Sequence, residues 1–520
     1  MIPFGPWHPD AAATNAPALL KAKGCLPGVQ DTVKGPAPAF VSELSPAPVS
    51  DAIGDVLLDD IGGVIIDDAD HTVYAFSTLS MQCLGLVSVI ENDGTVVQVA
   101  GTATNLYHLA SPAWLDVTNS GGPYATPPGE RWRFAGYNPY VLATNYIDQP
   151  QKYDTSSPAL FADLGGSPPK ARFIGVVRDQ VVLAGINGAE NALQFSGFNN
   201  SELWTIGGVG GADIQAFPDG GPLTGFVGGA VGYVFQATKV TRMTLTGEST
   251  IIYQFDEIQG GKGCVAPDSI VKAGDLIYYF AADGFQVLSI TTGEVKPLGI
   301  NKWREWFLDD YAPGTERLIL GARDPLNPII KWAYVSGSTT GILPGRAINY
   351  NWSLDEATYE DVSVEAISNW LTSGFNLDTL GTAGNMETLP FSLDSPFWRG
   401  GVPLLSVIDT SHRLNYFEGG TMQAEFITAD GASDARAFIR GTRPLVDTTD
   451  VTVAIAMRER DGDAENNAVP FPVQEVMESN GTVSAHASGF VARAQIIIPA
   501  GATWSKLKGI STSLGSMGKR

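Results

Sequence analysis

Short hydrophobic runs alternate with turn residues along most of this chain. From about residue 55, runs of β-branched and aromatic residues are separated by glycine, proline, asparagine and aspartate, a pattern typical of strands joined by tight turns. One short helix is predicted at 301–308, with Trp303, Trp306 and Phe307 in the core. The pattern therefore predicts an all-β protein. The clearest predicted strands are residues 72–76, 95–99, 180–183, 233–235, 276–280 and 331–335.

Asx-Gly pairs mark the expected hairpin turns. Both residues of such a pair accept a positive φ, which two-residue hairpin turns require. Residues 69–99 carry two expected hairpins, and 276–290 carry the clearest one. A meander of such hairpins in units of ~40–50 residues is typical of the blades of a β-propeller. No exact repeat emerges, so the number of blades stays open. A glycine follows Asp93, Asp219, Asp283, Asp430, Asp461, Asn187 and Asn480.

Composition divides the chain into five regions. Residues 1–50 contain nine prolines, and because proline lacks an N–H donor and fixes φ, we expect an extended arm rather than a regular sheet. Its Phe4, Trp7 and Phe40 are expected to dock on the chain's own body, with a neighbouring subunit as the alternative. The remaining regions are a β-propeller body at 51–370, an irregular glycine-rich loop insertion at 371–400, an additional C-terminal β region closing or flanking the propeller at 401–505, and a flexible basic tail at 506–520.

The charge balance is strongly acidic. The chain has 32 basic and 55 acidic residues, a formal net charge of −23, so it gains little from neutralising phosphates and is not expected to read a nucleic-acid sequence. The charge favours solubility or a surface that repels DNA. No secretion signal precedes the first strands, and no apolar run approaches the ~20 residues that span a bilayer. We expect synthesis in a reducing cytoplasm and no membrane span.

The residue types that usually carry chemistry are present without the spacing that chemistry needs. Three cysteines lie far apart, which encodes neither a disulfide framework nor a zinc site, and the histidines lack ligand spacing. The segment 260–264 (GGKGC) lacks the spacing of a phosphate-binding loop and is read as an ordinary loop. These scattered residues are Cys25, Cys83, Cys264, His8, His71, His108, His412 and His486.

An acidic cluster at 59–70 is a candidate calcium site. Its spacing is not that of an EF-hand and lacks the closing glutamate, so a solvated turn is favoured. A pair of glycosidase carboxylates cannot be picked out among 55 acids. We therefore expect no enzyme, no catalytic, cofactor-binding or metal residues, and no cofactor. The cluster consists of Asp59, Asp60, Asp67, Asp68 and Asp70.

Several segments resemble a family of virion proteins of short-tailed bacteriophages, the tail nozzle or packaged-DNA stabilisation proteins. The most telling is 129–134 (GERWRF), which runs on to 141–145 (VLATN) and 148–151 (DQPQ). Others, in the order that such proteins show them, are 3–10, 193–204, 232–236, 266–270, 283–285, 297–299, 500–504 and 518–520. The resemblance touches most of the chain, although each motif alone is loose.

The resemblance implies a structural protein rather than an enzyme. Members form a ring, usually a homohexamer, below the portal and the adaptor of the virion tail, around the channel through which DNA is ejected. The implied partners are the adaptor or head-to-tail connector, a tail fibre or a plug or needle protein, and exiting DNA in passive contact. Two alternatives remain: a receptor-binding tail spike or adhesin, and a glycan-degrading propeller enzyme.

Overall fold

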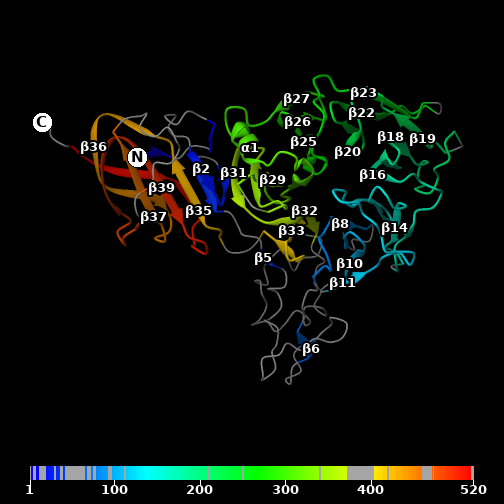
Figure 1. Ribbon diagram of the computed structural model, residues 1–520, viewed down its shortest axis with the longest axis horizontal. Coiled ribbons are helices and arrows are strands. Elements are labelled where there is room, and N and C mark those ends of the chain that lie inside the picture. The colour runs from blue at the N-terminus through cyan, green and yellow to red at the C-terminus, as the bar shows by residue number, and fades with distance from the viewer. Residues whose placement is uncertain are drawn as a thin grey trace.

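The computed structural model is built almost entirely of β-strands (Figure 1). It describes residues 2–3, 7–10, 19–28, 31–34, 39–40, 65–66, 72–73, 78–91, 96–110, 113–157, 159–207, 210–248, 251–338, 341–371, 403–417, 421–459, 471 and 474–516. Among these residues there is one α-helix, α1 (Arg304–Asp310), with two 3-10 turns, η2 (Pro267–Ser269) and η3 (Glu316–Leu318). The predicted all-β class is confirmed, and so is the short helix, which begins three residues later than expected. No helix in the described part of the chain is long and apolar enough to cross a membrane.

A β-propeller forms one half of the molecule (Figure 1), which confirms the predicted fold. Six four-stranded antiparallel sheets are separate blades, and a further four-stranded meander, β28–β31, occupies a seventh place between the fifth and sixth of them. The first two separate blades are β8 (Gly85–Ile90), β9 (Val96–Gly101), β10 (Leu106–Ala110) and β11 (Ala113–Asp116), then β12 (Arg133–Tyr137), β13 (Tyr140–Thr144), β14 (Gln151–Asp154) and β15 (Ala162–Asp163). The third and fourth are β16 (Ala171–Val177), β17 (Gln180–Ile186), β18 (Ala189–Phe195) and β19 (Asp213–Ala216), then β20 (Leu223–Val227), β21 (Gly232–Gln236), β22 (Val240–Leu245) and β23 (Tyr253–Glu257). The fifth and sixth are β24 (Val271–Ala273), β25 (Leu276–Ala281), β26 (Gly284–Ser289) and β27 (Val295–Pro297), then β32 (Val364–Leu371), β33 (Pro403–Asp409), β34 (Leu414–Tyr416) and β5 (Ala39–Phe40).

The chain closes the propeller with a strand from its own beginning. β5 pairs antiparallel with β34 and supplies the outermost strand of the last blade. Residues 403–416, assigned by sequence to the C-terminal region, therefore belong to the propeller. A separate hairpin joins β6 (Ile65–Ile66) to β7 (Thr72–Val73). Of the predicted loop at 371–400, Leu371 is the last residue of β32, and the rest lies outside the described residues.

The second half of the molecule is a C-terminal sheet that continues from the seventh blade. That blade consists of β28 (Leu320–Arg323), β29 (Ile329–Tyr334), β30 (Arg346–Asn351) and β31 (Glu356–Asp361), and β2 links β31 to β35 within a single 14-stranded sheet. The propeller and the C-terminal sheet are thus joined by hydrogen-bonded strands. The other strands of this sheet are β1 (Ile2–Pro3), β2 (Leu19–Lys23), β3 (Cys25–Gly28), β4 (Asp31–Lys34), β35 (Ala424–Thr428), β36 (Gly431–Val446), β37 (Thr452–Arg458), β38 (Glu475–Val476), β39 (Val483–Ile498) and β40 (Lys506–Ser516).

The two ends of the chain differ from the sequence-based expectation. The described residues of the proline-rich arm dock on the chain's own body, the favoured interpretation, but they do so as the short strands β1–β5. The expected flexible tail at 506–520 is wrong for its described part, because residues 506–516 form β40, which pairs with β36, β4 and β1. Buried Leu507 and Ile510 anchor this strand, and its pairing partners lie far away in sequence.

The Asx-Gly pairs have mixed outcomes. Asn187 lies in the β17–β18 hairpin and Asp283 in the β25–β26 hairpin, as predicted. Asp219 instead lies in the connection between two blades, and Asp430 is buried between β35 and β36. Asn480 lies in the turn that leads into β39. Asp93 and Asp461 are outside the described residues.

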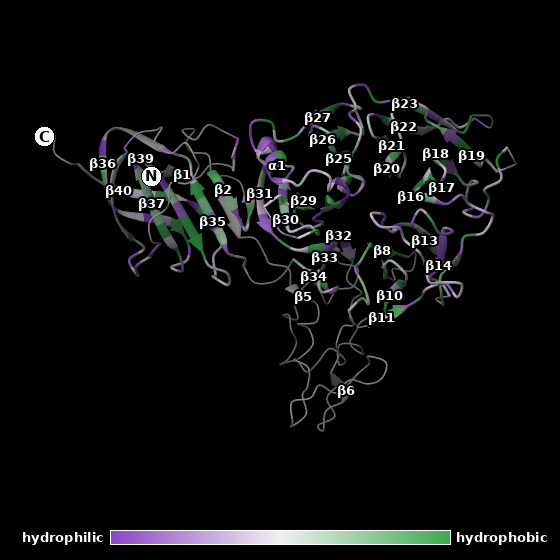
Figure 2. Ribbon diagram, in the orientation of Figure 1, coloured by the Kyte–Doolittle hydropathy of each residue, from purple (hydrophilic) through white to green (hydrophobic). Residues whose placement is uncertain are grey.

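Aromatic side chains fill the core where α1 covers the propeller. Trp303 and Phe307 are buried, as predicted, and Phe307 packs edge-on against Phe280. Trp306 is only half-buried and contacts Trp7 of the arm, with ring centroids 4.7 Å apart. Figure 2 shows α1 largely in the hydrophilic colour, since four of its seven residues are charged, and Phe307 is its one buried residue.

Candidate functional site

A cavity of about 320 Å³ lies at the centre of the propeller. Each blade contributes residues from its first, innermost strand or from the segment just before it, so all seven places in the ring reach the cavity. The cavity is therefore the axial channel of the propeller. It is lined by Gly85, Leu86, Val87, Arg131, Trp132, Arg133, Phe134, Phe173, Ile174, Gly225, Phe226, Val227, Pro267, Asp268, Ile270, Leu320, Gly321, Ala366 and Ile367.

Glycines allow the inner strands to approach one another around this channel. A Cβ atom on Gly85 would lie 2.5 Å from the carbonyl oxygen of Trp132 on the next blade. A Cβ atom on Gly225 would lie 2.2 Å from Cδ1 of Ile270. Such distances are below any ordinary van der Waals contact, so side chains at these positions would push neighbouring blades apart.

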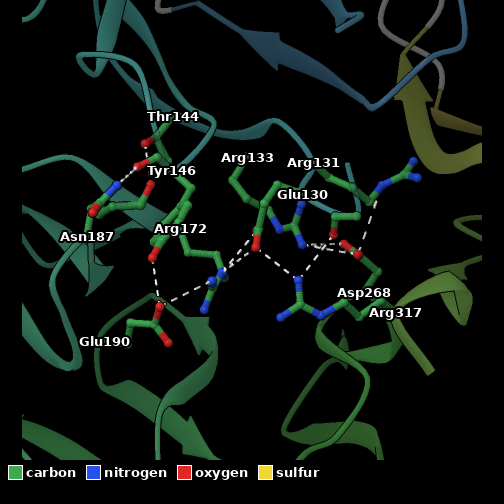
Figure 3. Close-up of polar contacts among 12 residues, drawn as sticks. Glu130, Arg131, Arg133, Thr144, Tyr146, Arg172, Asn187, Glu190, Asp268 and Arg317 are labelled. Carbon is green, nitrogen blue, oxygen red and sulfur yellow. Dashed lines mark hydrogen bonds and ion pairs between the residues drawn. The ribbon is translucent and has the colours of Figure 1, made fainter. Parts of the chain in front are cut away.

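A charged cluster occupies the end of the channel where the inner strands begin. Arg133 is the first residue of β12, and its Nη2 donates to Asp268 Oδ2 at 3.1 Å and lies 2.9 Å from Oδ1. Arg131 Nε lies 4.0 Å from the same carboxylate. Asp268 comes from η2, just before β24, so two arginines of one blade share one carboxylate from another blade. Figure 3 shows this group in close-up.

A second carboxylate is shared in the same way. Arg172 Nε donates to both oxygens of Glu130, at 3.1 and 2.9 Å, while Arg317 Nη1 donates to Oε1 at 2.9 Å. The Arg172 guanidinium also lies over the ring of Tyr146, 4.4 Å from its centroid, and 3.9 Å from the exposed Glu190. These contacts tie three blades together, because Glu130 precedes β12, Arg172 lies in β16 and Arg317 precedes β28 (Figure 3).

Glu365 links the last blade to the first. Its carboxylate accepts a hydrogen bond from the backbone N–H of Cys83 at 2.9 Å and lies 2.9 Å from Nδ1 of His412. Arg131 Nη2 donates to its backbone carbonyl at 2.9 Å. The Glu365 side chain is 2% exposed, so its charge must be compensated by these neighbours.

The electrostatics of the channel favour an anion. Among the residues that line the cavity, the charged ones are Arg131, Arg133 and Asp268, two cations against one carboxylate. Burial lowers the pKa of Arg133; Asp268 raises it, and the nearby Arg131 lowers it further. The net direction is downward because burial outweighs the ion pair with Asp268.

The cysteines and histidines noted in the sequence do not gather into one site. The described cysteines are free and buried, and burial raises the pKa of Cys83 and of Cys264 to about 12. His8 Nε2 lies 3.2 Å from Glu356 Oε2, and the His108 ring is tilted against that of Tyr153, with centroids 5.6 Å apart. His486 lies against Phe438, and His71 is outside the described residues.

Other sequence-based candidates are also accounted for. Lys262 of the GGKGC loop forms an ion pair with Asp283, the residue of the β25–β26 turn. The acidic cluster at 59–70 lies outside the described residues. Within the described ranges, no group of three or more histidine, cysteine, aspartate or glutamate side chains is placed to hold a metal ion.

Sequence reasoning missed the arginine cluster altogether. A signal was present, since Arg131 and Arg133 alternate around Trp132 at the start of a strand, and alternate residues of a strand share a face. The same segment was noticed only for its resemblance to a family. Arg172, Asp268 and Arg317 lie 39, 135 and 184 residues beyond Arg133, and only closure of the ring brings them to it.

Comparison with known proteins returns propellers of low similarity. No protein-family model and no curated protein matches the sequence. Similar solved structures include the β-propeller domain of Cps50 (Swd1) from Myceliophteria thermophila, 8% identical with a TM-score of 0.39 over 65% of this chain and 98% of that one. BamB from Moraxella catarrhalis is 11% identical with a TM-score of 0.37, over 74% and 99% of the two chains. The computationally designed protein Ika8 is 11% identical with a TM-score of 0.37, over 79% and 99%.

Proposed function

We propose that this chain is a structural subunit of the tail of a short-tailed bacteriophage, a nozzle that forms a ring, expected to be hexameric, around the DNA exit channel. The observation that carries the proposal is the join between its two halves. The propeller and the C-terminal sheet share one hydrogen-bonded sheet through β31, β2 and β35. A subunit that must transmit load along a tail needs such a continuous body. The order of the segments resembling the nozzle family supports the same role.

The charge of the chain supports passage of DNA without adhesion to the channel wall. At −23 per chain, a ring of several copies presents a strongly acidic assembly, and phosphates are repelled rather than bound. The proposed partners are the adaptor above the ring and a fibre or plug protein below it. The role is non-enzymatic: the ring of subunits retains the packaged genome and then releases it through the channel that the ring encloses.

The test is reconstruction of the complex. The full-length chain is mixed with the portal and adaptor proteins encoded in the same genome and imaged by cryo-electron microscopy. We expect a closed ring of this chain stacked on the adaptor, with the channel axes aligned. A chain that fails to bind the adaptor and instead forms a trimer that binds host glycan would overturn the proposal in favour of an adhesin. Release of reducing sugar from host polysaccharide by the purified chain would overturn it in favour of an enzyme.

A further inference from the structure

The centre of the propeller carries an excess of positive charge within a strongly acidic chain. The cavity lining holds two guanidiniums, Arg131 and Arg133, and one carboxylate, Asp268. Behind them Glu130 is shared by Arg172 and Arg317. Two guanidiniums therefore face one carboxylate in the lining; outside it, Arg172 also lies 3.9 Å from Glu190, and Arg131 binds the backbone carbonyl of Glu365, whose side chain is buried. Positive charge is concentrated here although the chain as a whole has a net charge of −23.

Burial makes this excess charge consequential. Arg131 and Arg172 are each 9% exposed, and water cannot compensate charges at such positions as it does at the surface. The lowered pKa of Arg133, caused first by burial and opposed by Asp268, points in the same direction. An anion entering the cavity would restore the balance.

The size and lining of the cavity define what fits. About 320 Å³ is at the lower end of the range for small-molecule sites. Guanidinium groups bind phosphate and carboxylate oxygens in a bidentate manner. Away from the arginines the wall is apolar and includes Leu86, Phe134 and Phe226. A small anion with a compact apolar part matches this division.

We propose that the axial cavity binds a small free anion bearing a phosphate or a carboxylate group, with Arg131 and Arg133 as its recognition residues. The Asp268 carboxylate already binds the guanidinium of Arg133. It therefore competes with the anion for the same hydrogen-bond donors. The inference does not depend on the nozzle role, because it concerns a single propeller. Failure of ring assembly leaves it standing, and failure of anion binding leaves the nozzle proposal standing.

The test is a titration of the full-length chain with inorganic phosphate and, in a separate arm, with succinate. Isothermal titration calorimetry is run in a buffer whose ionic strength is held constant with sodium chloride. We expect saturable binding of at least one probe with one site per chain, and the arm that binds more tightly identifies the group. Absence of saturable binding in both arms would overturn the proposal.

Two substitutions of the same ion pair give opposite expected results. Arg133→Gln removes a charge-assisted donor and is expected to weaken binding about 10-fold or more. Asp268→Asn removes the competitor and is expected to tighten binding. A purely structural ion pair predicts loss of stability in both variants and no opposite change in affinity. Equal affinities of wild type and both variants would overturn the proposal.

A matched control comes from an exposed arginine of the C-terminal sheet. Arg436 pairs with Glu459, and both side chains are about half exposed. Arg436→Gln removes the same charge from the chain, and we expect the affinity for either probe to stay unchanged. If Arg133→Gln fails to fold, as judged by circular dichroism, the tighter binding expected of Asp268→Asn still decides the matter. If Arg436→Gln lost as much affinity as Arg133→Gln, the loss would be due to the net charge of the chain alone. That result would overturn the proposed binding site.

Discussion

Individual charged residues hold the C-terminal sheet together from inside. Asp430 is 3% exposed and lies between the end of β35 and the start of β36. It accepts two hydrogen bonds from Arg493, Nε to Oδ1 at 2.8 Å and Nη2 to Oδ2 at 2.9 Å, and forms an ion pair with Arg458. Both arginines are themselves about nine-tenths buried. The carboxylate is therefore the counter-charge for two buried cations.

We expect Asp430→Asn to destabilise the C-terminal sheet by about 3–5 kcal/mol, because removing one partner leaves buried charge uncompensated. Hydrogen–deuterium exchange of peptides within β39 measures the local loss of stability. The control is Glu459→Gln, which breaks an exposed pair with Arg436 and is expected to cost about 1 kcal/mol or less. Equal exchange in the two variants would contradict the role given to Asp430.

The same residue shows what could and could not be predicted for single residues. Asp283 and Asp430 both precede a glycine, and the local sequence assigned both to hairpin turns. Asp283 lies in such a turn between β25 and β26. Asp430 does not, because Arg458 and Arg493 come from strands β37 and β39, 28 and 63 residues away. A turn propensity is a local property, whereas a buried counter-charge is set by tertiary contacts.

At the scale of elements, the N-terminal segment completes a helix that lies far away in sequence. The N-cap residue of α1, Trp303, makes no side-chain capping hydrogen bond. Asp10 of the arm caps the helix instead: Oδ2 accepts from the Glu305 N–H at 2.9 Å and Oδ1 from the Trp306 N–H at 2.8 Å. Trp7, 1% exposed, packs beside it. Trp7 is thus buried in its own chain and is not available to anchor a neighbour.

We expect Asp10→Ala to destabilise α1 by about 1 kcal/mol, since two backbone N–H groups lose their acceptor. Asp10→Asn keeps an oxygen that can cap the helix, so it is expected to retain most of the stability. Hydrogen–deuterium exchange of a peptide covering 304–310 measures the difference. The assignment would be wrong if alanine and asparagine had the same effect.

The junction between β2 and β31 gives a pH dependence. Burial alone would raise the pKa of Asp361, but its ion pairs with Lys23 and Arg346 outweigh burial and hold the pKa below its usual value. A carboxylate with a lowered folded pKa contributes stability above its unfolded pKa, and this contribution is lost as the pH falls through the folded pKa. Arg346 Nε lies 3.2 Å from this carboxylate.

We therefore expect wild type to be more stable than Asp361→Asn at pH 7, with the difference shrinking below about pH 4. Thermal unfolding midpoints of both proteins, measured from pH 3 to 7, give this comparison. Because Asp361 is nearly half exposed, solvent screens the pair and the effect is expected to be modest. A difference that grows on acidification would contradict the sign.

Strands within a hairpin could be predicted from sequence, whereas strands paired over long distances could not. Residues 276–290 alternate around an Asp-Gly turn, and they form β25 and β26. Residues 506–516 are mostly polar or glycine apart from three apolar positions, and they form β40 only because β36 supplies pairing partners 61 to 79 residues upstream. Proline in the arm did not prevent pairing, because β1 and β3, which contain Pro3 and Pro27, are short strands at edges of the sheet, where proline is tolerated.

At the scale of the whole molecule, strands from the beginning of the chain pair with its last strand. β1 and β4 both pair with β40, and β5 completes the last blade. The two halves visible in Figure 1 are therefore not independent domains joined by a single linker. The sequence correctly predicted a propeller followed by a second β region. It did not predict that strands of the proline-rich arm form part of both, β5 in the last blade and β1 to β4 in the C-terminal sheet.

The acidic charge makes a prediction about the proposed ring. Subunits of −23 each repel one another, and the range of this repulsion falls from about 30 Å at 0.01 M salt to about 10 Å at 0.1 M. We therefore expect the ring fraction, measured by mass photometry at fixed protein concentration, to rise between those salt concentrations. Sucrose at matched osmolality does not screen charge, and as a control it is expected to leave the ring fraction unchanged.

Two outcomes separate the assembly from its electrostatics. A ring fraction that falls with salt would mean that opposite charges across the interface outweigh the repulsion, and the acidic surface would then have to lie away from the subunit contacts. A chain that stays monomeric at every salt concentration, with and without the adaptor, would contradict the proposal that it forms a ring. Since screening acts only on charges near water, the buried arginine cluster of the propeller is expected to keep its contacts throughout the titration.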